Sequence, residues 1–139
     1  MDKEEKKIKH LEMIETVIER MGNNSFQLKG WSVTIVSIVG ALSAQGSEKK
    51  FFLLAFIPLL AFWMLDAFYL QIERKYRVLY QNTLDDKIPT FDMNINGINT
   101  NNDKNIRFLR CLFAPVEGWF YLSIIGVLIT LAILIGAFQ

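Results

Sequence analysis

The stretch Phe51-Phe-Leu-Leu-Ala-Phe-Ile-Pro-Leu-Leu-Ala-Phe-Trp-Met-Leu-Asp66-Ala-Phe-Tyr-Leu70 decides the fold of this chain. Every residue in it except Asp66 is apolar, aromatic or proline. A helix of about 20 such residues is long enough to cross the hydrocarbon core of a bilayer. The stretch therefore predicts a transmembrane helix, in which Asp66 is the residue that needs a physical explanation.

Asp66 is expected to face other protein groups or water. A charged residue in the middle of a membrane helix costs about 2.5–3.5 kcal/mol on insertion scales, and such residues point into the protein and pair there. The nearest candidate partner is Lys29, at the start of the preceding apolar run. In an antiparallel hairpin the two residues reach a similar depth, with Trp31 and Trp63 expected to flank them.

Two further apolar runs predict spans over 26–45 and 118–139. The short polar loop 46–50 joins the first span to the second, which is expected over 51–72. Pro58 is expected to kink the second span, because proline removes a backbone donor and clashes with the preceding turn. Beyond 72 the helical pattern continues without a breaker, so the helix is expected to end near Leu84.

The N-terminal segment 1–25 predicts an amphipathic helix. Its apolar residues recur three and four positions apart, at Ile8, Leu11, Ile14, Val17, Ile18 and Met21. The opposite face mixes acids and bases, whereas a helix lying on a membrane surface usually carries a basic face. Packing against the rest of the protein is therefore favoured. Gly22-Asn-Asn-Ser25 is expected to break this helix, with Asn24 or Ser25 capping the next one.

The segment 73–117 predicts a helix extension followed by a loop that contains six asparagines between 90 and 105. The composition favours a polar loop, and the turn dipeptide Asn96-Gly97 leaves a short β-hairpin as the alternative. The basic, amphipathic stretch 106–113 is expected to lie at the membrane interface. The predicted fold class is thus all-α: an integral membrane protein with three transmembrane helices, an N-terminal amphipathic helix and a small cytosolic segment.

The distribution of Lys and Arg predicts the orientation. Residues 1–29 hold six, the loop 45–50 holds two, the segment 72–117 holds seven and the C-terminal tail holds none. Because positive residues concentrate on the cytoplasmic side of membrane proteins, the N-terminus is expected in the cytoplasm and the C-terminus outside. The expected location is the bacterial inner membrane, crossed several times.

Three polar residues are candidates for a site inside or at the edge of the membrane: Asp66, Lys29 and Glu73. Asp66 and Glu73 lie on one helical face, together with Arg77. This face has three interpretations: a lock between helices, a polar lining for water or ions in an oligomer, or a proton-coupling site. One carboxylate per chain suits a ring of identical subunits, since rings of acidic residues select cations.

Arg74, Lys75 and Arg77 are candidates for binding a ligand where the second span leaves the membrane. Basic residues at that position attract anionic lipid headgroups. A phosphate or nucleotide ligand is the alternative. Glu73 and Arg77 are four residues apart, so they are also able to pair with each other.

Small residues four apart mark two of the expected spans. They are Gly30, Thr34, Ser37 and Ala41 in the first span and Gly126 and Thr130 in the third. Small residues let two helices approach closely in lipid. Packing between the spans of one chain is the favoured interpretation, and a seam between subunits of a homo-oligomer is the alternative.

The sequence contains no recognisable catalytic or cofactor-binding motif, so no enzyme activity, cofactor or metal is expected. The chain has one histidine, His10, expected to be solvated, and one cysteine, Cys111, expected to be an inert small hydrophobic residue. A catalytic zinc site uses three protein ligands, which these residues do not supply. The formal net charge of +1 argues against binding nucleic acid.

Two stretches, residues 20–34 and 58–80, resemble a widespread group of small bacterial inner-membrane proteins, over about residues 14–82. The architecture is similar to that of membrane effectors of bacterial antiphage systems. The resemblance implies an oligomeric protein of the lipid bilayer that permeabilises the membrane or conducts ions when a cytosolic partner or ligand triggers it. The alternative function is a membrane anchor or scaffold that recruits a cytosolic enzyme.

Overall fold

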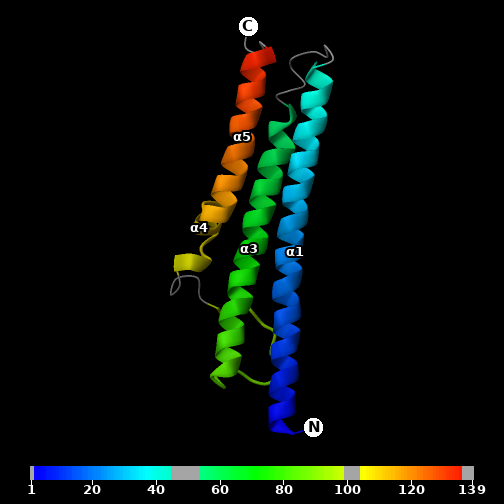
Figure 1. Cartoon of the computed structure of the whole chain (residues 1–139). Helices are drawn as coiled ribbons and strands as arrows, with labels where there is room; N and C mark the ends of the chain where they lie inside the picture. Colours follow the sequence, from blue (N-terminus) through cyan, green and yellow to red (C-terminus); the bar gives the residue numbers. More distant parts are fainter. Residues whose placement is uncertain (1, 45–53, 99–103, 136–139) are drawn as a thin grey trace.

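The computed structural model describes residues 2–44, 54–98 and 104–135, and this part of the chain is helical with no strand. In the described part of the chain, the long helices α1, α3 and α5 run side by side, with the short helices η1 and α4 beside them (Figure 1). The elements in chain order are α1 (Lys3–Ala44), α3 (Phe56–Leu84), the 3-10 helix η1 (Lys104–Ile106), α4 (Phe108–Leu112) and α5 (Pro115–Ile135).

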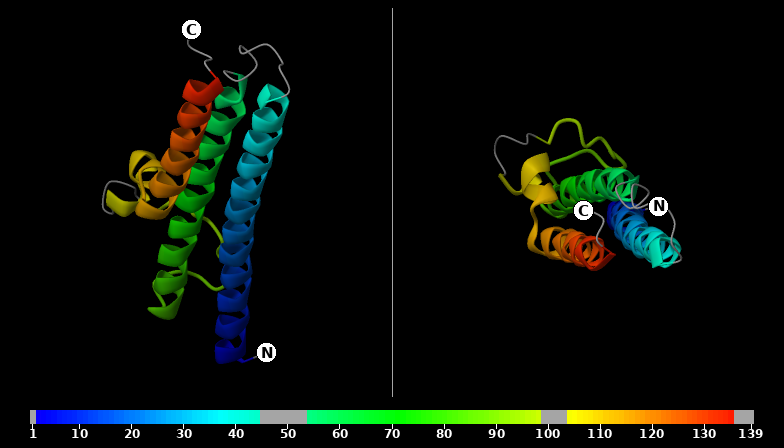
Figure 2. Two further views of the ribbon diagram at one scale, coloured as in Figure 1. Left: turned by 45° about the horizontal axis from the view of Figure 1, so that its top comes forward. Right: turned by 90° about the horizontal axis from the view of Figure 1, so that it is seen from above.

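The three long helices form a bundle in which α3 runs antiparallel to α1 and α5. Seen from above, the three long helices form a triangle, and η1 and α4 lie outside it (Figure 2). The described residues include an apolar core in the bundle, made of Val36, Ala55, Leu59, Tyr121, Leu128 and Ala132. Each long helix contributes to this core, so the third helix is packed into the fold and does not stand apart from the hairpin.

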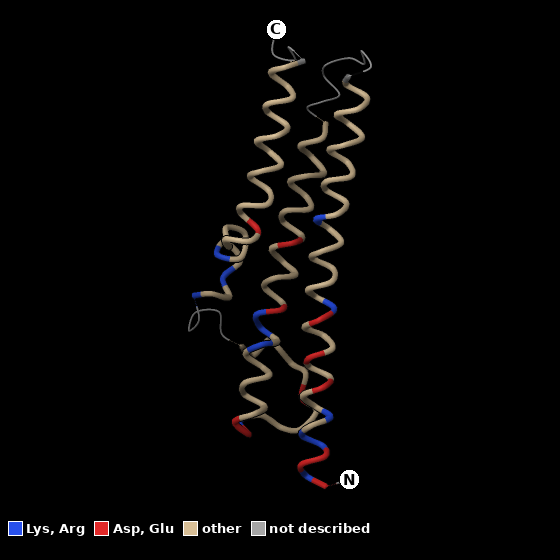
Figure 3. Tube along the Cα trace, in the orientation of Figure 1, with Lys and Arg blue, Asp and Glu red and all other residues tan. Residues whose placement is uncertain are grey.

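All three long helices are long and apolar enough to cross a membrane, as the sequence predicts. Residues 30–44, 56–65 and 118–135 contain no charged residue, and this half of the bundle is free of charge in Figure 3. Large apolar side chains cover its outside: Ile57, Trp119 and Leu134 are 67%, 76% and 77% exposed. Large exposed apolar patches of this kind mark surfaces that meet other molecules or a membrane.

Helix α1 runs without interruption through residues 22–25, so the predicted break there is wrong. A glycine in the interior of a helix costs only about 1 kcal/mol relative to alanine, which tertiary packing easily exceeds. Helical geometry also places Ser25 one turn from Lys29, whose ammonium group donates a hydrogen bond of 2.8 Å to the Ser25 hydroxyl. The amphipathic N-terminal segment and the first span are therefore parts of one helix.

Helix α3 ends at Leu84, as predicted, and its end is capped by backbone groups. The Asp86 N–H donates to the carbonyl of Thr83, and the Lys87 N–H donates to the carbonyl of Asn82. This pattern is a Schellman motif, in which one residue adopts the left-handed conformation. Here that residue is Asp86, with a φ of 53°.

Pro58 lies in the first turn of α3, which begins at Phe56. The first backbone N–H groups of a helix have no partner inside it, so a proline there loses no hydrogen bond. Pro58 therefore suits the start of α3, and the kink predicted within the second span stays a prediction. Residues 45–53, which include the predicted start of that span, lie outside the described residues.

Residues 85–98, here called the strap, leave the end of α3 and lie against α1 as an irregular segment. A turn forms at Asn96-Gly97, with the Ile98 N–H donating to the carbonyl of Ile95, but Asn96 lacks the positive φ of the type I′ turn that a hairpin favours. No strand flanks it among the described residues, so the strap is the predicted polar loop and not a hairpin. Its side chains cap its own backbone instead: the Asn94 N–H donates to the carboxylate of Asp92.

His10 is buried, so the prediction of a solvated histidine is wrong. Its Nε2 lies 3.0 Å from the carbonyl oxygen of Asp92 in the strap, and its ring centroid lies 5.9 Å from that of Phe91. Lys7 ties the same region together: its ammonium donates to the carbonyl of Leu84 and lies 3.1 Å from the carboxylate of Asp86. The strap, which covers His10, thus fixes the N-terminal part of α1 to the end of α3.

Candidate functional site: a buried charged lock between three helices

Lys29, Asp66 and Glu117 meet where the three long helices come together, and are here called the lock. The Lys29 ammonium on α1 lies 2.6 Å from Oδ2 of Asp66 on α3 and 2.7 Å from Oε2 of Glu117 on α5. The side chains are 16%, 0% and 5% exposed, respectively. The predicted approach of Lys29 to Asp66 is therefore present, and a carboxylate from the third helix completes the cluster.

The lock holds one ammonium group against two carboxylates. With all three groups ionised, it carries a formal charge of −1. Lys29 donates a hydrogen bond to Asp66, but its contact with Glu117 is an ion pair without hydrogen-bond geometry. Asp66 Oδ1 and the buried hydroxyl of Tyr121 have no hydrogen-bond partner among the described residues. Removing one side of a buried ion pair typically costs 3–5 kcal/mol, because the remaining charge is left uncompensated.

The local sequence explains how Glu117 reaches the lock. Pro115 opens α5, where its fixed φ suits a helix and its missing N–H has no partner to lose. Glu117 consequently lies in the first turn, where the helix dipole favours a negative charge. Sequence reasoning did not identify the contact of Glu117 with Lys29, because nothing in the local pattern shows which depth the start of α5 reaches.

Trp63 packs beside the lock through Tyr121. Trp63 stacks on Tyr121, with ring centroids 5.8 Å apart and planes inclined by 15°. Tyr121 in turn lies close enough to interact electrostatically with both Asp66 and Glu117. Trp31 is 64% exposed and lines a surface hollow together with Phe62 and Tyr69 of α3, so it lies on the outer side of this region. The wall of the lock is thus aromatic on the α5 side, where the Lys29 ammonium also lies 5.9 Å from the centroid of Phe120.

Glu73, the third polar candidate, lies outside the lock. Its carboxylate accepts two hydrogen bonds from Arg77, at 2.8 and 3.0 Å, which is the pairing that the four-residue spacing predicts. The Arg77 side chain is 64% exposed. The polar face from Asp66 to Arg77 therefore has two parts. Asp66 is buried and contacts another helix, whereas Glu73 and Arg77 pair with each other on α3.

Arg74 belongs to a set of side chains on α3 that hold residues 104–114, here called the elbow. The Arg74 guanidinium donates to the carbonyl of Asn105, and the side-chain amide of Gln71 donates to the carbonyl of Ile106 at 2.9 Å. The indole N–H of Trp63 donates to the carbonyl of Leu112, also at 2.9 Å. Three side chains of one helix thus satisfy backbone carbonyls along the elbow.

Cys111 lies buried in the elbow, facing α3. Its sulfur is 3.7 Å from a guanidinium nitrogen of Arg74. Burial raises the pKa of the thiol, and the positive charge of Arg74 opposes that rise only in part. A buried thiol with a raised pKa is a poor nucleophile, which agrees with the expectation of an inert small residue.

The stripes of small residues face outward, so the favoured prediction that they pack inside the chain is wrong. The residues concerned are Gly30, Thr34, Ser37, Ala41, Gly126 and Thr130, all of them exposed. The Thr34 and Thr130 hydroxyls donate to the carbonyls of Gly30 and Gly126, both at 2.9 Å. Their polar groups are therefore satisfied within each helix, and the surface they leave is smooth and nearly apolar.

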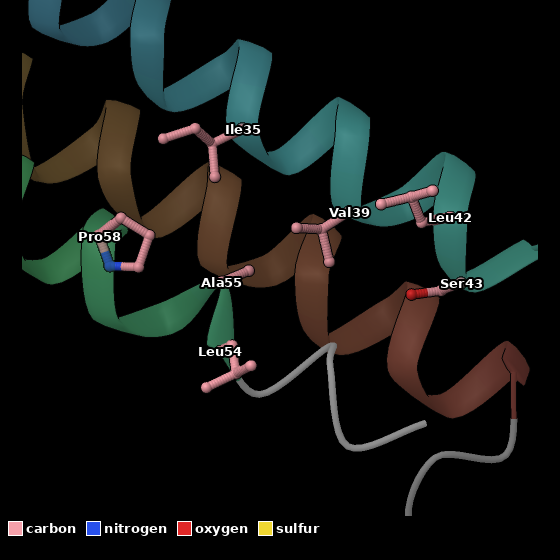
Figure 4. A pocket seen from close by; sticks show the side chains of 7 residues that line it. All are labelled: Ile35, Val39, Leu42, Ser43, Leu54, Ala55 and Pro58. Carbon is pink, nitrogen blue, oxygen red and sulfur yellow. The ribbon is translucent and has the colours of Figure 1, made fainter. Parts of the chain in front are cut away.

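Two of the cavities among the described residues show contrasting linings. One of about 300 Å³ lies between the end of α1 and the start of α3, lined by apolar side chains and a single hydroxyl, Ser43 (Figure 4). The other, here called the stalk cleft, has a volume of about 480 Å³ and is lined by Glu15, Ile18, Glu19, Arg77, Tyr80 and Gln81. The first offers no charged group for recognition, whereas the second offers both signs of charge.

Comparisons with known proteins leave the family open: no protein-family model, curated protein or solved structure matches this chain.

Proposed function

We propose that the chain is a multi-pass protein of the bacterial inner membrane that works as a homo-oligomeric effector, changing the permeability of the bilayer when a cytosolic partner or ligand engages it. Its cytosolic part is the stalk, defined as residues 3–25 of α1, residues 71–84 of α3 and the strap. One observation carries the proposal: α1 and α3 both run unbroken from the stalk into the apolar bundle, and the lock joins them to α5 on the way.

The continuity of the two helices links a binding event on the stalk to the lock. A helix transmits a displacement along its length, because its backbone hydrogen bonds resist bending. Moving α1 relative to α3 and α5 separates Lys29 from its two carboxylates. These carboxylates then repel each other and require water or a cation, since an unpaired charge is costly in an apolar surrounding. Opening the lock thus creates a hydrated, negatively charged path, which favours the passage of cations.

The outward-facing small residues support an oligomer. A Cβ atom added at Gly30 or Gly126 would meet nothing within 4 Å in the chain itself. Small residues on a lipid-facing helix surface let a second helix approach closely. Within the proposal, these surfaces of α1 and α5 contact neighbouring copies of the chain, and the Asp66 side chains line the path only after the lock opens.

The resemblance of residues 20–34 and 58–80 to small bacterial inner-membrane proteins adds support. These stretches contain Lys29 and Asp66, the two lock residues that donate and accept its hydrogen bond. Within the proposal, the effector belongs to an antiphage system, with its N-terminus in the cytoplasm and its C-terminus outside. Thirteen Lys and Arg residues then lie on the cytoplasmic side, in residues 1–29 and 72–117, against two in the loop 45–50.

Membrane potential in living cells tests the permeability proposal. Wild type and Asp66→Asn are expressed in cells loaded with a potential-sensitive dye, alone and together with the neighbouring genes. Asp66→Asn weakens the lock and is expected to depolarise the membrane without a trigger. Asp86→Asn is the matched control, because it removes a carboxylate that is 64% exposed on the stalk. If neither wild type nor Asp66→Asn alters the potential, alone or with those genes, the permeability proposal fails.

The mass of the protein in native nanodiscs tests the oligomer. Wild type is expected to contain more than one copy of the chain, and Gly30→Leu or Gly126→Leu is expected to lower that number. Gly22→Leu is the control, because Gly22 also has free space around it but lies on the stalk. A wild type that is monomeric in nanodiscs contradicts the homo-oligomer and with it a path lined by several copies of Asp66.

A membrane anchor or scaffold is the second candidate function, favoured by the surface of the stalk. Ile8 and Met13 are 57% and 43% exposed there, although this part of α1 is expected in water. The stalk cleft adds charged and aromatic side chains from both helices. A pull-down in mild detergent distinguishes the two functions. A stoichiometric cytosolic partner that is lost in Ile8→Lys, together with no self-association, favours the scaffold.

A further inference from the structure

We infer that the elbow is a binding site for anionic lipid headgroups, in which Arg107 and Arg110 contact lipid phosphate groups at the cytoplasmic surface of the membrane. The inference rests on the proposed placement of the three long helices in a bilayer. It adds to the proposed function a specific lipid chemistry and a place on the fold where that lipid binds.

The elbow exposes large apolar side chains that continue onto α5. Leu109 and Phe113, four residues apart, are 69% and 65% exposed. Val116 and Trp119 follow in the first turns of α5, with exposures of 72% and 76%. Such side chains are unfavourable in water but suit the boundary between headgroups and acyl chains, where tryptophan is also enriched. The patch therefore leads directly from the elbow into a helix that is able to span a membrane.

Basic side chains lie beside this apolar patch. Arg107 and Arg110 are both exposed and lie three residues apart, and Lys104 is exposed at the start of η1. Arg110 donates to the side-chain oxygen of Asn105 at 3.1 Å, a neutral partner that leaves its positive charge in place. Among the described residues, no carboxylate forms an ion pair with these three side chains. The elbow consequently presents uncompensated positive charge next to exposed apolar surface.

The basic residues of α3 are engaged in a different way. Arg77 pairs with the Glu73 carboxylate, and Arg74 holds the carbonyl of Asn105 in the elbow. Arg74 and Arg77, the predicted candidates for headgroup binding, therefore have partners within the chain. The basic side chains that are available to a lipid are those of the elbow.

The elbow is held in a fixed shape before any lipid binds. Its carbonyls at residues 105, 106 and 112 accept hydrogen bonds from Arg74, Gln71 and Trp63. Ile106 and Cys111 are buried against α3, which points Arg107 and Arg110 outward. A guanidinium group offers two parallel donors that match a phosphate, and a fixed backbone reduces the conformational entropy lost on binding. These features suit a lipid phosphate at a defined position.

Spin-labelled lipids test the inference with the full chain in proteoliposomes. The immobilised fraction is measured for labelled phosphatidylglycerol and labelled phosphatidylcholine. Wild type is expected to prefer phosphatidylglycerol by about fivefold or more, because each basic residue near an anionic surface contributes about that factor. Arg107→Gln combined with Arg110→Gln is expected to remove most of this preference. Lys6→Gln combined with Lys9→Gln is the matched control: it removes two exposed positive charges from the stalk and is expected to keep the preference.

The outcomes separate this inference from the proposed function. Equal immobilisation of the two lipids by wild type, or an undiminished preference in the elbow variant, overturns the lipid site while leaving a membrane-spanning protein. The absence of any immobilised phosphatidylcholine contradicts membrane insertion and overturns both. Binding of inorganic phosphate to the wild type but not to the elbow variant, together with equal immobilisation of the two lipids, assigns the site to a free anion and contradicts a lipid. If the elbow variant elutes from a size-exclusion column at the same volume as wild type, the variant is folded.

Discussion

The lock and the elbow both hold basic side chains near the start of α5, but the chain treats these charges in opposite ways. Lys29 is largely buried and contacts carboxylates from two other helices. Arg107 and Arg110 are exposed and meet no described carboxylate. The lock has an excess of negative charge, and the elbow an excess of positive charge. A charge that the chain itself neutralises stabilises the arrangement of its helices, whereas a charge left uncompensated at the surface is available to a partner.

Replacing Lys29 is expected to have the largest effect on stability. Lys29→Met leaves two buried carboxylates without a cation and is expected to destabilise the protein by about 3–5 kcal/mol. Unfolding in mixed detergent micelles, followed by circular dichroism, measures the change. Adding Asp66→Asn and Glu117→Gln to the same chain removes the negative charges and is expected to restore much of the loss. Wild-type stability of Lys29→Met would show that the three groups do not act as a unit.

Replacing one carboxylate is expected to have a smaller effect, because Lys29 keeps one partner. Asp66→Asn is expected to cost about 1–3 kcal/mol, the usual range for a buried group that loses its hydrogen-bonding partner. Glu117→Gln is expected to cost less than Asp66→Asn, because only Asp66 accepts a hydrogen bond from Lys29. The same unfolding measurement ranks the two variants. The reverse order would mean that α5, and not α3, is the main partner of Lys29.

Replacing the elbow arginines is expected to leave stability nearly unchanged. Arg107→Gln combined with Arg110→Gln alters exposed side chains and is expected to shift the free energy of unfolding by no more than about 0.5 kcal/mol per site in lipid-free micelles. This result, set beside Lys29→Met, separates charges that stabilise the fold from charges that bind a partner. A loss as large as that of Lys29→Met would place the arginines among the residues that hold the elbow.

Alkylation of Cys111 gives the smallest and most local test. Its burial and raised pKa predict that little thiolate is present near neutral pH and that iodoacetamide reacts slowly. The control carries Arg107→Cys and Cys111→Ala, which places the only thiol on the exposed side of the elbow and is expected to react much faster. Equal rates, measured by mass spectrometry, would indicate that the elbow detaches from α3 in solution.

Helical periodicity and hydropathy are enough to predict the three long helices, the end of α3 at Leu84 and the approach of Lys29 to Asp66. These features follow from local pattern and from the antiparallel course of a helical hairpin. The contact of Glu117 depends on how the elbow returns the chain to the bundle, and the burial of His10 depends on the strap. Both are contacts between segments distant in sequence, which no local pattern encodes.

The small-residue stripes show a different limit. The spacing of Gly30, Thr34, Ser37 and Ala41 identifies correctly which residues share one side of a helix. The spacing does not predict whether that side contacts another helix of the same chain, because small residues are compatible both with lipid and with a packed helix. The local pattern also fails at Gly22, where α1 continues without a break. Glycine costs a helix only about 1 kcal/mol relative to alanine, so tertiary packing determines whether the helix continues.

The length of α1 has a mechanical consequence. At 1.5 Å per residue its 42 residues form a rod of about 63 Å. The lock holds this rod at Lys29, with 26 residues on the stalk side and 15 on the other, counted from its ends at Lys3 and Ala44. Such a rod is a lever with unequal arms. A tilt about Lys29 moves the far end of α1 opposite to the stalk, by about three fifths of the distance, so a large, weak movement at the stalk becomes a shorter, stronger one among the spans.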